Sequence, residues 1–118
     1  MRKTIIAGNW KMHKTVSEAV ELAEDIVMET NGTLNEVVIF PPFTALETVA
    51  DAIDGKHVGY GAQDLHWEDK GAFTGAVSGA MIADICAEYV LVGHSERRTI
   101  FGENEKIVAS KIIAAYRN

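Results

Sequence analysis

Two segments of this sequence place polar side chains directly after an apolar run. Asn9 and Lys11 follow the first such run of the chain, and His94 and Glu96 follow a later one. A lysine in that position could neutralise a phosphate or stabilise a developing oxyanion. A histidine at the start of a helix is kept neutral, because a helix amino terminus disfavours positive charge, and a neutral imidazole can polarise a carbonyl or donate a proton.

Each of these residues also has a purely structural interpretation. Lys11 could be an exposed loop lysine, and His94 could be tied to the local backbone. Glu96 could be a helix cap, and Arg97 and Arg98 could simply be solvated. Residue type and spacing alone leave these alternatives open.

The elements that must position these side chains form four βα units in a single domain of 118 residues. Short runs rich in β-branched and aromatic residues alternate with amphipathic stretches, and the runs lack the alternation of a strand with one solvated face. They therefore predict a parallel sheet that is buried on both sides. The pattern fits either an open doubly wound sheet or an arc of a (β/α)₈ barrel. The predicted strands are 4–7, 36–40, 57–61 and 89–92.

Helix starts are indicated by two capping boxes, at residues 15–18 and 44–47. We expect these two helices to stop at Gly32 and near Gly55. A third helix is predicted over 80–86 and a fourth over 104–116. Cys86, in an apolar pattern, is expected to be buried, and Ile107, Val108, Ile112 and Ala115 are expected to face inward.

Overall charge and composition exclude several classes of partner. The net charge is -6 and there is no run of Lys or Arg, so nucleic acid is not expected to bind. The apolar start is too short for a signal peptide or a membrane span, and the lone cysteine fits a reducing cytoplasm. The histidines show no metal-ligand spacing, so no metal site is expected.

The loop over 63–75 is long and carries large aromatic side chains. Long ordered loops in compact domains usually have a function. We expect this loop to insert into a partner subunit, and the alternative is a lid that folds back on its own domain.

Three segments together resemble the triosephosphate isomerase family: residues 7–12 (AGNWKM), 71–75 (GAFTG) and 89–98 (YVLVGHSERR). They occur in the family's order and with suitable separations. Residues 40–44 and 61–64 are also similar, so the resemblance covers essentially the whole chain but only about half of the family's usual length. The implied fold is α/β, a parallel (βα)₄ half of a TIM (β/α)₈ barrel.

The resemblance implies interconversion of dihydroxyacetone phosphate and glyceraldehyde 3-phosphate through an enediolate, without a cofactor. Asn9 and Lys11 match the family's substrate-binding residues, and Lys11 supplies positive charge. His94 matches the neutral electrophile that moves protons at the substrate oxygens. Glu96 matches a carboxylate near the lysine, so that Lys11, His94 and Glu96 form the implied catalytic group.

The resemblance also assigns an interface loop and shows two departures. Phe73, Thr74 and Gly75 match the loop tip that reaches the neighbouring active site in the family's dimer. Ala76 stands where the family usually has an acidic residue that pairs with an arginine, which puts docking of this loop in doubt. Gly79 stands where a proline is common, which is expected to loosen the entry to the third helix.

The family's glutamate base, its lid and its phosphate-binding glycines have no counterpart in these 118 residues. We therefore expect the chain by itself to be inactive or very weak, since a general base contributes roughly 10²- to 10⁴-fold. The alternative is a catalytically inert half-barrel that associates with itself. Half a barrel exposes a sheet edge at each end, so a homo-oligomer is expected, most simply a dimer.

Overall fold

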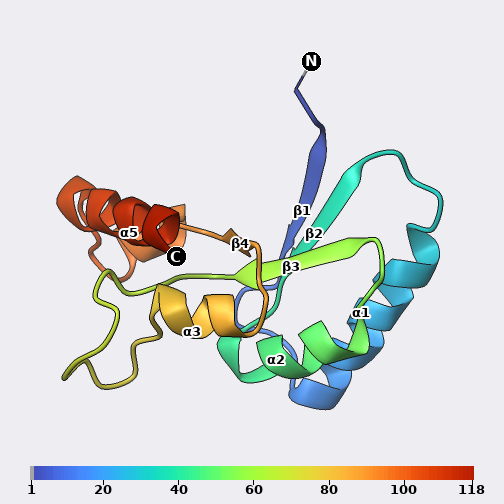
Figure 1. Ribbon diagram of the computed structural model, residues 1–118, viewed down its shortest axis with the longest axis horizontal. Coiled ribbons are helices and arrows are strands. Elements are labelled where there is room, and N and C mark those ends of the chain that lie inside the picture. Colours follow the sequence, from blue (N-terminus) through green and yellow to red (C-terminus); the bar gives the residue numbers. More distant parts are fainter. Residues whose placement is uncertain (1) are drawn as a thin grey trace.

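The protein forms a single curved sheet of four parallel strands in the order β1-β2-β3-β4. The structure is a computed structural model that describes residues 2–118. Each strand pairs in parallel with the next one in the sequence, and the order never reverses as it would in a doubly wound sheet. This settles the open alternative in favour of a (βα)₄ arc (Figure 1). The strands are β1 (Ile5–Asn9), β2 (Glu36–Phe40), β3 (Val58–Ala62) and β4 (Tyr89–Val90).

Five helices connect and follow the strands in the described part of the chain. The first two pack against one another, and Figure 1 shows the last one across the molecule from them. The short fourth helix follows β4 after four residues and was not among the predicted helices. The helices are α1 (Val16–Glu29), α2 (Phe43–Ala52), α3 (Gly79–Asp84), α4 (Ser95–Thr99) and α5 (Glu105–Arg117).

One of the two predicted capping boxes forms. Glu18 Oε1 accepts hydrogen bonds from the Thr15 backbone N–H (3.1 Å) and the Thr15 hydroxyl (2.7 Å), and these bonds lower the pKa of Glu18. The prediction for 44–47 is wrong, because α2 begins at Phe43, two residues before the start that Thr44 as a cap would give, and Thr44 lies inside the first turn. Pro42 is the last extended residue (φ -62°, ψ 153°), and its carbonyl accepts from the Ala45 N–H at 3.0 Å. The extended ψ of Pro42 thus keeps this residue outside the helix and makes it the N-cap of α2.

Burial differs sharply between the strands. Residues 37–40 of β2 are buried, as predicted for a strand covered on both faces. In β1, by contrast, Ile5 is 49% exposed and Ile6 is 53% exposed. β1 pairs only with β2 within residues 2–118, so one of its edges is open.

The hydrophobic core has two parts. One part lies between α1, α2 and the sheet (Ala19, Ala23, Ile39, Val49, Ile53), and the other lies near α3 and α5 (Leu46, Ala62, Leu65, Ile82, Ala114).

Two side chains expected in the interior are exposed. Cys86 lies in the turn after α3 with φ 61°, and its thiol is accessible instead of buried. Ile112 is 43% exposed, and Lys111 is buried in its stead at 4% exposure. The inward stripe of α5 runs through Val108, Lys111 and Ala114, a spacing of three residues that passes over Ile112.

Residues 2–118 contain no helix with the length and apolar character needed to cross a lipid bilayer.

Candidate active site

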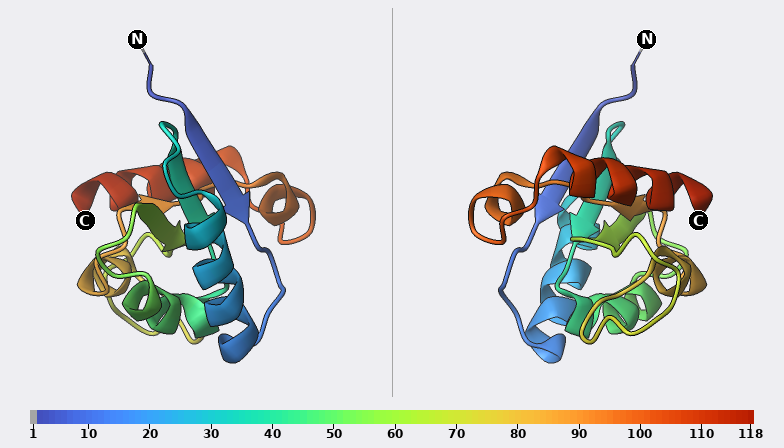
Figure 2. Two further views of the ribbon diagram at one scale, coloured as in Figure 1. Left: turned by 90° about the vertical axis from the view of Figure 1, so that its right-hand side faces the viewer. Right: turned by 90° about the vertical axis from the view of Figure 1, so that its left-hand side faces the viewer.

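Lys11, in the loop after β1, meets Glu96 of α4. The Lys11 Nζ lies 2.6 Å from Glu96 Oε1, and this hydrogen bond lowers the pKa of Glu96. Both side chains are partly exposed, at 49% and 40%. Strands β1 and β4 occupy opposite edges of the sheet, so it is the curvature of the arc that brings the carboxyl end of β1 beside α4, drawn in orange in Figure 2.

The backbone of Lys11 adopts an unusual conformation. Its φ is 55°, in the left-handed region that L-residues rarely occupy. The Asn9 side-chain oxygen Oδ1 accepts a hydrogen bond from the Lys11 N–H at 3.0 Å. Asn9, which the family resemblance assigns to substrate binding, therefore also helps to shape the lysine's turn.

His94 caps the amino end of α4 through its ring. Its Nδ1 accepts a hydrogen bond from the Glu96 backbone N–H at 3.2 Å. A backbone N–H can only donate, so Nδ1 carries no proton and the hydrogen of the neutral ring is on Nε2. The Glu96 carboxylate oxygen Oε2 lies 3.6 Å from Nδ1, which is too far for it to accept a hydrogen bond from a proton on that nitrogen. His94 is thus tied to local backbone, and the same bond leaves its Nε2–H free to donate.

A glycine makes the turn between β4 and α4 possible. Gly93 has φ 65°, and a Cβ there would lie 2.9 Å from Val108 Cγ1 of α5. Only glycine combines that conformation with that close approach. The Gly93 carbonyl in turn accepts a hydrogen bond from Arg98 Nε at 2.8 Å, so Arg98 fixes the turn.

A network of charged side chains connects α4 to neighbouring segments. Arg97 donates to Glu103 and lies 3.3 Å from Asp64 Oδ2, so it is not merely solvated. Lys111 Nζ bonds Asp64 Oδ1 at 2.7 Å and Glu103 Oε2 at 3.0 Å. Burial raises the pKa of Glu103, but the hydrogen bonds from Arg97 and Lys111 outweigh burial and hold that pKa below its usual value. The network joins α4, α5 and the loop after β3.

Sequence reasoning missed this network and one further contact of the site. Lys111 sits three residues after the inward-facing Val108, which was an available signal for its burial. Gln63, the first residue after β3, donates from Nε2 to the Lys11 carbonyl at 2.9 Å. No local pattern indicates that contact, because it spans 52 positions of sequence.

The loop over 63–75 partly packs on its own chain. The Phe73 ring centroid lies 4.2 Å from that of His66, which in turn lies 4.2 Å from that of Trp67. Thr74 and Gly75 at the tip are exposed. The loop thus folds back through its aromatic side chains and presents its tip, so insertion into a partner subunit remains a prediction.

The entry to α3 holds a helix cap next to Gly79. Ser78 caps this helix, and its Oγ accepts from the Met81 N–H at 3.2 Å. A Cβ at Gly79 would meet the Asn118 side chain at 2.7 Å from Nδ2, so Asn118 occupies the space next to this glycine.

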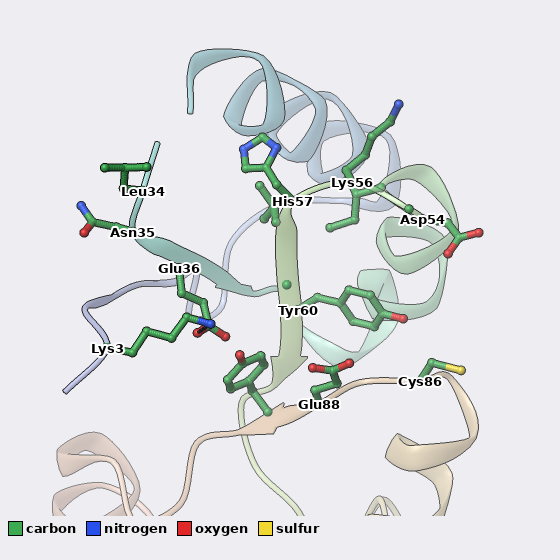
Figure 3. A pocket seen from close by; sticks show the side chains of 15 residues that line it. Lys3, Leu34, Asn35, Glu36, Asp54, Lys56, His57, Tyr60, Cys86 and Glu88 are labelled. Atoms are coloured by element: carbon green, nitrogen blue, oxygen red, sulfur yellow. Dashed lines mark ion pairs between the residues drawn. The ribbon is translucent and has the colours of Figure 1, made fainter. Parts of the chain in front are cut away.

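A hollow of about 550 Å³ lies at the other end of the sheet, near the amino ends of the strands (Figure 3). There Lys3 Nζ pairs with Glu36 Oε2 at 2.7 Å. None of Asn9, Lys11 or His94 lines it. The convergent polar groups, rather than the size of this hollow, therefore locate the candidate site. No cluster of His, Cys, Asp or Glu among residues 2–118 is arranged to hold a metal ion.

Comparison with known proteins decides the family. A sequence model described as triosephosphate isomerase matches residues 4–118. The chain belongs to the triosephosphate isomerase family. It is 52% identical over 118 residues to the triosephosphate isomerase of Moorella thermoacetica, covering all of this chain and 47% of that protein. It is 49% identical over 115 residues to that of Thermoanaerobacter pseudethanolicus, covering 98% of this chain and 46% of that protein.

Solved structures agree with the family and with the fold. The crystal structure of triosephosphate isomerase from Bartonella henselae matches with a TM-score of 0.89 and 36% identity, covering 98% of this chain and 48% of that one. The chain therefore spans about half the length of the triosephosphate isomerases it matches, and it corresponds to their amino-terminal part.

Proposed function

We propose that this chain contributes the lysine and histidine side of a triosephosphate isomerase active site, acting on triose phosphates. The observation that carries the proposal is the convergence of Lys11, His94 and Glu96 at one end of the arc, with Lys11 Nζ 2.6 Å from Glu96 Oε1. The reaction in this proposal is taken from the family: a proton moves between adjacent carbons of the substrate through an enediolate.

Each group has a defined part in this chemistry. The Lys11 ammonium offers positive charge to the substrate's oxygens and phosphate, next to Asn9. The His94 ring, with its proton on Nε2, donates a hydrogen bond to the substrate carbonyl and can take up and return protons at the substrate oxygens. Glu96 holds the ammonium in place by accepting its hydrogen bond.

The base that removes the carbon-bound proton has to come from outside these 118 residues. In the proposal it belongs to the portion of the family's length that this chain does not span, about half. A chain without this base loses roughly 10²- to 10⁴-fold in reaction rate, because general base catalysis is missing. Activity is therefore expected only when that portion is supplied, as continuing chain or as a separate polypeptide.

A complementation assay tests the proposal. The purified 118-residue chain is assayed for isomerisation of glyceraldehyde 3-phosphate in a coupled assay, alone and after mixing with the unmatched carboxyl-terminal part of the Moorella thermoacetica relative. We expect turnover in the mixture and little or none with either part alone. Mixtures containing His94→Gln or Lys11→Met, purified in parallel, control for contaminating host enzyme and should be strongly impaired. No activity in the mixture, although the two parts co-purify as a complex, would overturn the proposal.

A second candidate function, self-association of an inert half-barrel, is favoured by the exposure of β1. Ile5 and Ile6 are about half exposed along an open strand edge, a surface that promotes pairing with another chain. We expect a homodimer in sedimentation equilibrium at micromolar concentration. Ile6→Lys should weaken it, whereas Leu34→Lys, in the fully exposed loop before β2, should not. A stable monomer of the unsubstituted chain would rule this candidate out.

A further inference from the structure

We propose that Gln63 is a positioning residue of the site, which holds Lys11 in place through the lysine's backbone. Gln63 Nε2 lies 2.9 Å from the Lys11 carbonyl oxygen and 2.8 Å from the Phe40 carbonyl oxygen. Carbonyl oxygens only accept hydrogen bonds, so the nitrogen of the amide must face them and both of its hydrogens are used. The amide of Gln63 thereby joins the carboxyl ends of three successive βα units.

The conformation of Lys11 explains why such a residue is needed. At φ 55° the backbone of Lys11 lies in a region that costs energy for any residue with a Cβ, and it persists only when its surroundings hold it. Its N–H is bound by the Asn9 side chain and its C=O by the Gln63 side chain. In the described structure, the backbone N–H and C=O of Lys11 are thus both bound by side chains and not by the hydrogen bonds of a helix or sheet.

The side chain of Lys11 depends on the same turn. Lys11 leaves β1, yet its Nζ has to reach Glu96 on α4 across the mouth of the arc. If the peptide relaxes to an ordinary negative φ, the direction of the Cα–Cβ bond changes and the ammonium leaves Glu96. Gln63 therefore helps to position the Lys11 ammonium without contacting that group.

Other residue types at position 63 fail for definable reasons. Asparagine is one methylene shorter and cannot reach both carbonyls. Glutamate has the same shape, but its carboxylate is an acceptor facing two acceptors, which is repulsive. Leucine fills similar space and offers no donor.

The test is an NMR titration of the intact 118-residue chain, which needs no turnover. The readout is the pKa of the Glu96 carboxyl, followed through its side-chain ¹³C signal, because the hydrogen bond from Lys11 lowers that pKa. We expect Gln63→Leu and Gln63→Glu each to raise it towards the value measured in Lys11→Met. Ser78→Ala, which removes a helix cap elsewhere, serves as the matched control and should leave it at the unsubstituted value.

Several outcomes would overturn the inference. One is an unchanged Glu96 titration in folded Gln63→Leu, and another is an equal shift in Ser78→Ala. Loss of folding in both Gln63 variants by circular dichroism would also overturn it, since Gln63 would then support the whole fold. The role of Lys11 in binding substrate rests on the proposed function, but this titration can succeed or fail independently of the complementation assay. In an active mixture, Gln63→Leu is expected to lower kcat/KM by about 10- to 100-fold.

Discussion

Lys11 Nζ and Glu96 Oε1 lie 2.6 Å apart although 85 positions of sequence separate the two residues. The strands that precede them, β1 and β4, are at opposite edges of the sheet. In a flat sheet their ends would be well separated, because adjacent strands are about 4.8 Å apart. The ion pair can form only because the four βα units curve into an arc, so the site depends on that curvature.

Replacing Glu96 by glutamine should change pH behaviour more than stability. The pKa of Glu96 is held below its ordinary value of 4.5 by the hydrogen bond from Lys11. The pair's contribution is therefore fully present above pH 4.5 and is lost as pH falls through the lower, folded-state pKa. At pH 7 we expect Glu96→Gln to leave the urea midpoint almost unchanged, since exposed pairs contribute little. Glu47→Gln, on the exposed face of α2, is the control. A large loss specific to Glu96→Gln at pH 7 would contradict this view.

Lys111→Met should be strongly destabilising, whereas Lys106→Met on the exposed side of the same helix should be nearly neutral. Lys111 is 4% exposed and bonds both Asp64 and Glu103, so its removal leaves two carboxylates facing one arginine. Breaking a buried pair in this way costs about 3 kcal/mol in the free energy of unfolding, measurable by urea denaturation.

Adding Glu103→Gln to Lys111→Met should recover part of that loss. The double variant leaves Asp64 and Arg97 as a balanced pair, 3.3 Å apart. A double variant that is less stable than Lys111→Met alone would show that charge balance is not what the network provides.

Ser78 and Thr44, each near the start of a helix, should respond differently to alanine. Ser78 Oγ accepts the Met81 N–H, so Ser78→Ala should lower the free energy of unfolding by about 1 kcal/mol. Thr44 lies within the first turn of α2, where no side-chain cap bond forms, and Thr44→Ala should be neutral or slightly stabilising. Equal losses from both substitutions would indicate that Thr44 acts as a cap after all.

Two strand glycines should differ in how they tolerate a methyl group. A Cβ on Gly61 would lie 2.7 Å from the Phe40 ring and against the Tyr89 carbonyl of β4. Gly61→Ala should therefore force β3 and β4 apart and cost on the order of 1–3 kcal/mol. Gly8→Ala, whose Cβ would find only ordinary contacts at 3.8 Å or more, is the matched control. Thermal unfolding that shows the same melting temperature for both variants would refute the steric argument.

Some of the fold follows directly from local sequence. Strand β2 has the predicted bounds, 36–40, and α5 begins after the predicted Asn104, whose Oδ1 accepts from the Ile107 N–H at 2.9 Å. The start of α1 at Thr15 was predicted from its capping box, which forms. These features depend on residues a few positions apart, so a short window of sequence contains the interactions that determine them.

Other features were decided by tertiary structure. Lys11, Asn9 and His94 could be proposed as site residues from their types and from the family resemblance, but the pairing of Lys11 with Glu96 required the curved sheet. Lys111 is buried because Asp64, 47 positions away, supplies a matching charge, and the side chain of Gln63 reaches Lys11 across 52 positions. Local sequence dictates which groups stand at the strand ends. Their geometry was set by contacts between distant segments, because hydrogen bonds and ion pairs act only over a few ångströms and form once the chain has folded.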